Sequence, residues 1–225
     1  MTDAPIEIAE AREGATPPRP AWYVDPRLRR LGSGLVGATF WLLFAYANIH
    51  SSIESHRVMG LGVGVLGVWA SVLFIVRRQP VQVSRSLPVW AIAYAGTFGA
   101  SLLRPGGGES GWADAVGLSI QCLAIVLGAF GYLALGRSFG LVPANRGLVT
   151  SGVYRLVRHP LYSSYVVADI GYLIQSPSAW NVGVLLAVWA CQVLRLLSEE
   201  RLLSGDPDYR AYCKRTRWRL VPGLW

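Results

Sequence analysis

Six apolar segments divide this chain, and most are long enough to cross the hydrocarbon core of a bilayer as helices. A core about 30 Å thick needs about 20 apolar residues in a helix. Only 15% of the residues are charged, against about a quarter in soluble domains. We therefore predict an all-α, polytopic integral membrane protein with six transmembrane helices rather than a soluble domain. The fifth segment is short for a full crossing, and the six lie near 32–49, 58–76, 87–103, 113–135, 161–175 and 178–197.

The distribution of positive charge predicts how these helices are oriented. Loops rich in Lys and Arg stay in the cytoplasm. With six spans, 19 of the 21 basic residues fall on one side of the membrane, and only Arg57 and Arg104 fall on the other. The protein is therefore expected to lie in the cell membrane with both termini in the cytoplasm. The net charge of +8 is explained by this topology and by contact with anionic headgroups of membrane lipids, so no nucleic-acid partner is expected.

Three regions follow from this organisation. Residues 1–30 form a disordered or interfacial tail, 31–135 a four-helix membrane region, and 136–225 two further membrane helices with a long cytoplasmic connection and a C-terminal segment. In that segment, Asp206 and Pro207 predict the start of a short helix, as cap and first residue. The glycines of the second apolar segment are interpreted as helix-packing residues. No metal site is expected, since no metal-ligand spacing occurs at Cys122, Cys191 and Cys213.

The connection 136–162 is too apolar to be a solvated linker, and long ordered loops are often functional. Pro160 suits the first turn of the fifth helix, where its missing N–H costs nothing. His159 is then the N-cap, and Arg158 precedes it. Because a helix N-terminus favours anions, this end is suited to bind a carboxylate or phosphate. Alternatively, Arg158 and His159 are simply interfacial basic residues.

The end of the sixth helix carries both signs of charge. Arg195 and Glu199 lie four residues apart and share a helix face, whereas Glu200 points about 100° away from Glu199. One of the two acids is expected to pair with nearby arginines. The other is suited to face a cationic group, such as a sulfonium or an amine, or a ribose hydroxyl.

Asp169 lies in the middle of the fifth segment, where a carboxylate is costly and usually faces a cavity or a partner. Tyr162, Tyr165, Asp169 and Tyr172 form one stripe of the helix. The stripe is suited to line a cavity. Alternatively, Asp169 hydrogen-bonds to a neighbouring tyrosine or to Gln121.

Four motifs occur in a fixed order in the last two fifths of the chain. They are Gly147–Tyr154, Arg158–Tyr162, Glu199–Leu203 and an ending that contains Tyr209, Tyr212, Lys214, Arg215, Arg217 and Pro222. Together they resemble the signature of the isoprenylcysteine carboxyl methyltransferase family and its wider phospholipid-methyltransferase-like group. The resemblance covers roughly residues 136 to 223, and the first four apolar segments add nothing to it.

The resemblance implies an integral membrane methyltransferase that uses S-adenosylmethionine, bound at the cytoplasmic side beneath the C-terminal segment. The implied acceptor is lipophilic or small: a prenylcysteine-like carboxylate, a lipid amine or a thiol. Arg195 and Glu199 are the implied catalytic residues, with Arg195 and Asp169 on the acceptor side. The cofactor-binding set is Gly147, Leu148, Val149, Tyr154, Arg158, His159, Pro160, Leu161, Tyr162, Glu199 and Glu200.

Two other functions remain open. Steroid-reductase-like membrane proteins, which use NADPH, carry a related Arg-His-Pro-x-Tyr segment, usually with Asn before the tyrosine and an acid soon after it. Here Leu161 precedes Tyr162, and two serines follow, which favours methyl transfer. A non-catalytic membrane scaffold or sensor is the second alternative. Two positions depart from the methyltransferase pattern, since Ser164 stands where that family often has Gly, and Asp169 has no counterpart in it.

Overall fold

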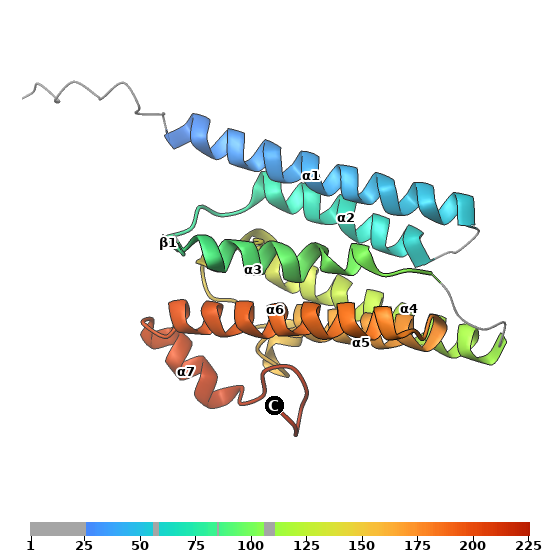
Figure 1. Ribbon diagram of the computed structural model, residues 1–225. Coiled ribbons are helices and arrows are strands. Elements are labelled where there is room, and N and C mark those ends of the chain that lie inside the picture. Colours follow the sequence, from blue (N-terminus) through green and yellow to red (C-terminus); the bar gives the residue numbers. More distant parts are fainter. Residues whose placement is uncertain (1–25, 56–58, 85, 106–110) are drawn as a thin grey trace, which may run out of the picture.

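The described part of the chain is mostly helical, as predicted. The computed structural model describes residues 26–55, 59–84, 86–105 and 111–225, so most of the predicted N-terminal tail lies outside the described residues. The helices are α1 (Pro26–Ser55), α2 (Met59–Val76), α3 (Leu87–Phe98), α4 (Gly111–Leu135), α5 (Pro160–Gln175), α6 (Ala179–Leu203) and α7 (Pro207–Arg215), with short 3-10 helices η1 (Gly99–Leu102), η2 (Gly136–Ser138) and η3 (Gly152–Arg155). Helices α1 to α6 run side by side as a bundle, and α7 lies at an angle to them beyond the end of α6 (Figure 1).

Three of these helices are long and apolar enough to cross a membrane, over Leu31–Glu54, Gly111–Ser138 and Ala179–Leu203. Two shorter apolar stretches cover Gly60–Val76 and Leu87–Leu102. The remaining predicted span, α5, has 16 residues, fewer than the roughly 20 of an upright crossing. Large apolar side chains point outward along the bundle, among them Leu43, Leu133 and Leu186. Such a surface is suited to contact with lipid.

Segments that the charge count assigns to one side of the membrane gather at one end of the bundle, which we call the site end (Figure 1). Two short strands, β1 (Gln82–Val83) and β2 (Ala144–Asn145), pair antiparallel there. They join the α2–α3 connection to the segment that follows α4. The end of α6 and the whole of α7 lie at the same end. The opposite end, where α3 passes into η1 and α6 begins, we call the far end.

Phe139 anchors the connection 136–159 to the core of the helix bundle. Its ring packs against Trp41 of α1, Phe74 of α2 and Tyr132 of α4, with ring centroids 6.3, 5.5 and 5.2 Å apart. Leu141 is buried in the same cluster. Because apolar burial fixes this stretch, the residues that follow it are held in place at the site end.

Glycines bring neighbouring helices into backbone contact. A Cβ added at Gly117 of α4 would lie 2.6 Å from the carbonyl oxygen of Gly171 in α5, and one at Gly171 would lie 2.8 Å from that of Gly117. Three glycines of α2 approach α1, since side chains there would meet Ala45, Ile49, Asn48 or Ser52, and the fourth, Gly62, faces Ile125 of α4. The packing role predicted for these glycines is therefore confirmed.

Replacing Gly171 with alanine is expected to destabilise the protein by about 1–3 kcal/mol, because a backbone carbonyl cannot move aside as a flexible side chain can. Gly183 of α6 is the matched control, since a Cβ there meets nothing within 4 Å. Gly183→Ala should be neutral or slightly stabilising. Thermal unfolding in detergent measures both variants, and equal midpoints would contradict the close α4–α5 crossing.

Candidate functional site

A cavity lies at the site end, where the segment 136–159, the start of α5, the end of α6 and α7 meet. It holds about 880 Å³ of empty space, a volume that includes open solvent at its mouth. Ten of the thirteen site residues predicted from the sequence line this cavity. They are Gly147, Leu148, Val149, Tyr154, Arg158, His159, Leu161, Tyr162, Arg195 and Glu199.

The N-terminus of α5 is built as predicted, with His159 as N-cap and Pro160 as the first helical residue. Pro160 does not line the cavity but fixes where the helix begins. The backbone N–H groups of Arg158 and His159 donate to the carbonyls of Trp218 and Arg219, both at 2.9 Å. The C-terminal segment is therefore laid directly against the start of α5.

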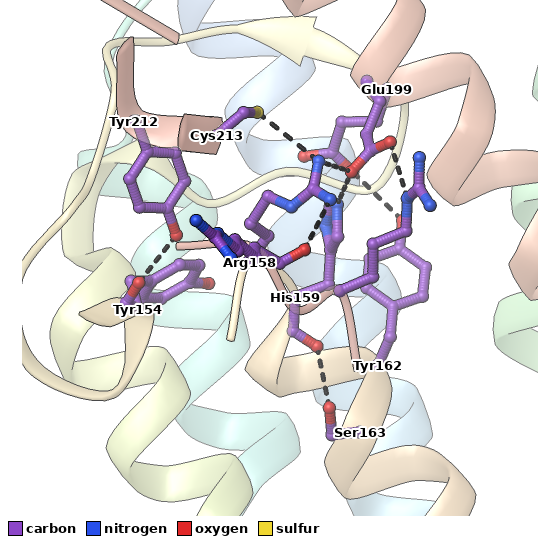
Figure 2. A network of polar contacts seen from close by, with 11 residues as sticks. Tyr154, Arg158, His159, Tyr162, Ser163, Glu199, Tyr212 and Cys213 are labelled. Carbon is purple, nitrogen blue, oxygen red and sulfur yellow. Dashed lines mark hydrogen bonds and ion pairs between the residues drawn. The ribbon is translucent and has the colours of Figure 1, made fainter. Parts of the chain in front are cut away.

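Glu200 holds three cationic or titratable side chains together, and two of them, Arg158 and His159, are labelled in the polar network of Figure 2. One oxygen accepts from Arg158 at 2.7 Å and lies 3.2 Å from His159 Nε2, and the other accepts from Arg219 at 2.9 Å. All four side chains are largely buried. The expectation that one of the two acids pairs with arginines is confirmed, and that acid is Glu200. It lies outside the cavity wall and ties the C-terminal segment to α5 and α6.

Glu199 is the acid that faces the cavity. Its Oε2 accepts from the Tyr162 hydroxyl at 3.1 Å, and among the described residues no donor reaches Oε1. Arg195 lies one turn earlier, with its guanidinium 5.2 Å from the centre of the Tyr162 ring and donating to Thr97 Oγ1 at 3.0 Å. Arg195 is 8% exposed, and its Nε has no partner. One carboxylate and one buried guanidinium thus share a wall of the cavity.

Arg146 also lines the cavity, although it was not predicted as a site residue and entered only the count of basic residues on one side of the membrane. Its side chain is 9% exposed, its Nε has no partner, and its guanidinium covers Gly140, where a Cβ would collide with it. Burial and the nearby Arg77 lower the pKa of Arg146 to about 10, so it remains charged at neutral pH. In the sequence, the contact between Gly140 and Arg146 is indicated only by a glycine six residues before an arginine.

Asp169 does not reach the cavity. Its Oδ2 accepts from the indole N–H of Trp189 in α6 at 2.8 Å, whereas the partners expected from the sequence were a tyrosine or Gln121. Gln121 instead donates to Gln175. Two members of the predicted stripe, Tyr162 and Tyr165, do line the cavity. The cavity wall therefore follows the first turns of α5 only.

The charges of the cavity favour a ligand that carries both signs. Arg146 and Arg195 lack a carboxylate partner within ion-pair distance in the described part of the chain, and burying such cations unpaired is costly. A ligand carboxylate would satisfy them, and Glu199 would satisfy a cationic group or a hydroxyl. Tyr154 stays neutral beside them, because burial and the Glu199 carboxylate raise its pKa.

The comparisons with known proteins concern this part of the chain. Residues 113–205 match the family model described as phospholipid methyltransferase. Over 109 residues, or 46% of the chain, it is 32% identical to protein-S-isoprenylcysteine O-methyltransferase A of Arabidopsis thaliana. Over 106 residues, or 44% of the chain, it is 30% identical to the B protein of that plant. The chain spans about half the length of these two relatives, 55% and 54%. Residues 113–205, which run from α4 to α6 and contain the start of α5 and Glu199, are therefore similar to the phospholipid methyltransferase family, and the chain is similar to the two isoprenylcysteine O-methyltransferases.

Proposed function

We propose that this protein is an integral membrane methyltransferase that moves a methyl group from S-adenosylmethionine to a lipophilic acceptor. The observation that carries the proposal is that one carboxylate, Glu199, lines the same cavity as two buried guanidinium groups, Arg146 and Arg195. Among the described residues, neither guanidinium has a carboxylate within ion-pair distance. S-Adenosylmethionine carries a carboxylate, an ammonium and a sulfonium, so its binding needs both signs of charge. When bound, it supplies an activated methyl group, so the protein's task is mainly positioning and desolvation.

The residues of the cavity fit this cofactor by their chemistry. Glu199 Oε1 is available to accept from an ammonium or a ribose hydroxyl, and Tyr162 fixes the orientation of the carboxylate through Oε2. Arg146 offers its guanidinium to a carboxylate of the cofactor. Arg195, one turn from Glu199, is suited to hold the acceptor. The side chains of Leu148 and Val149 add an apolar wall, and the C-terminal segment held by Glu200 limits access of water.

The acceptor in this proposal is a prenylcysteine-like carboxylate, a lipid amine or a small thiol. The two relatives are named as enzymes that O-methylate isoprenylcysteine, and the unpaired guanidinium of Arg195 supports an acceptor of the same carboxylate type. The proposal includes six membrane crossings, with α2, α3–η1 and α5 crossing beside the three long helices. It also includes cytoplasmic termini in the cell membrane, and a methyltransferase region of residues 136–225 attached to the four-helix region 31–135.

Purified protein in detergent is expected to bind S-adenosylmethionine in calorimetry and to transfer tritium from its labelled methyl group to a lipid or thiol pool. NADPH is the matched ligand control, because three arginines in the cavity wall would also suit its phosphates. Binding of NADPH in place of S-adenosylmethionine would support a reductase of the steroid-reductase type. Cofactor binding without methyl transfer to any pool would support a scaffold or sensor.

A further inference from the structure

An apolar groove runs along α6 at the far end, away from the cofactor cavity. It lies between α6 and the α3–η1 stretch and holds about 870 Å³ of empty space, part of it open to the surroundings. Its walls are apolar throughout and mostly small, which is why the two helices leave a channel; they include Ala95, Gly99, Leu102, Gly183, Ala187 and Cys191. From Trp180 to Cys191 the groove follows twelve residues of helix, whose eleven steps of about 1.5 Å span about 16 Å. That length is close to half of a hydrocarbon core about 30 Å thick, the depth of one acyl chain.

At Trp180, the mouth of this groove carries a guanidinium group that lies over the indole ring. The Arg104 guanidinium lies 4.2 Å from the centre of the Trp180 ring, and the Trp180 indole donates to the Leu102 carbonyl at 2.9 Å. Asn181, which is 1% exposed, clamps the backbone of Arg104 by accepting from its N–H at 3.0 Å and donating to its carbonyl at 2.9 Å. The backbone that carries Arg104 is therefore held in place beside the groove.

The charge at this mouth is unmatched among the residues that the structure describes. No carboxylate of the described residues comes within ion-pair distance of Arg104. The planar donors of a guanidinium match a phosphate well, and an aromatic ring beside it is typical of the headgroup level of a membrane. An apolar channel one acyl chain deep that ends at such a group has the charge and shape of a phospholipid site.

We propose that this groove binds an anionic glycerophospholipid, with its phosphate at Arg104 and one acyl chain along α6 from Trp180 to Cys191. The site is separate from the cofactor cavity, because a polar layer lies between them. In that layer, Gln192 donates to the Gly96 carbonyl and Arg195 to Thr97. The bound lipid is therefore a structural ligand of the α3–α6 contact rather than the methyl acceptor.

Native mass spectrometry of delipidated protein with dioleoyl phosphatidylglycerol tests this site. One lipid should remain bound to the wild type. Arg104→Gln should raise its dissociation constant about 10-fold or more, the loss expected for a hydrogen bond to a charged group. Gly183→Leu should abolish binding by filling the groove, and a Cβ at Gly183 meets nothing within 4 Å.

The controls are Arg201→Gln, an exposed arginine at the site end, and Leu186→Phe, an exposed position on α6 outside the groove. Both should retain the lipid. Thermal unfolding and S-adenosylmethionine binding, measured on every variant after delipidation, should match the wild type, which separates this test from that of the methyltransferase. Equal retention of phosphatidylglycerol by the wild type, Arg104→Gln and Gly183→Leu would overturn the proposal. So would equal competition by uncharged dioleoylglycerol, since the groove would then select no phosphate.

Discussion

Glu199→Gln should weaken S-adenosylmethionine binding roughly 10- to 100-fold, because hydrogen bonds to charged groups contribute about 1.5–3 kcal/mol. The amide keeps the size of the side chain and still offers an oxygen to the Tyr162 hydroxyl, which now donates to Oε2 at 3.1 Å. What it loses is the negative charge on the oxygen that faces the cavity. Calorimetry in detergent measures the affinity directly, and the methyl-transfer rate should fall at subsaturating cofactor.

The matched control is Glu54→Gln, the same chemical change at an exposed position of α1 whose partner is His50. It should bind the cofactor as the wild type does. An unchanged affinity in Glu199→Gln would remove Glu199 from the cofactor site. His159→Ala is a weaker companion test, because this ring lines the cavity but is also tied to Glu200, so some loss of binding would arise from movement of the C-terminal segment.

Local sequence rules located the helices and the start of α5. Pro160 fixes the helix start through its missing N–H, and His159 is the cap for that reason. Asp206 likewise caps α7, accepting from the N–H of Asp208. These features depend on a few adjacent residues. The helix lengths agree less well with the predicted spans, since α3 gives way to η1 after Phe98. Within the described residues, three helices have the length and apolar character of a full span, whereas the sequence predicts six spans.

Contacts between distant segments were not predictable from the sequence. The pattern predicted that one of two adjacent acids pairs with arginines, but docking of Arg219 decides that Glu200 is the paired one. The partner of Asp169 is Trp189, on the next helix, and its choice depends on how α5 and α6 rotate against each other. Arg146 enters the cavity because β2 and Gly140 turn its side chain inward. Each of these outcomes needs the tertiary packing.

Removing Glu200 is expected to abolish cofactor binding, although Glu200 does not touch the cavity. In Glu200→Ala the side chains of Arg158, His159 and Arg219 lose their shared carboxylate, and Arg158 is left largely buried. Breaking a buried ion pair by deleting one partner costs about 3–5 kcal/mol. The loss should release the C-terminal segment from α5, and with it α7, which supplies Tyr209 and Tyr212 to the cavity wall.

Trypsin reports this release, because the segment from Lys214 to Arg219 holds four basic residues and is held against the start of α5 in the intact protein. Glu200→Ala should be cut there faster than the wild type and should unfold at a lower temperature. Glu199→Gln is the matched neighbour, since it should lose the cofactor while keeping protease resistance and thermal stability. If both variants lose the cofactor but are cut at the wild-type rate, Glu200 acts on the ligand through charge alone. The ion-pair cluster would then not be what holds the C-terminal segment over the site.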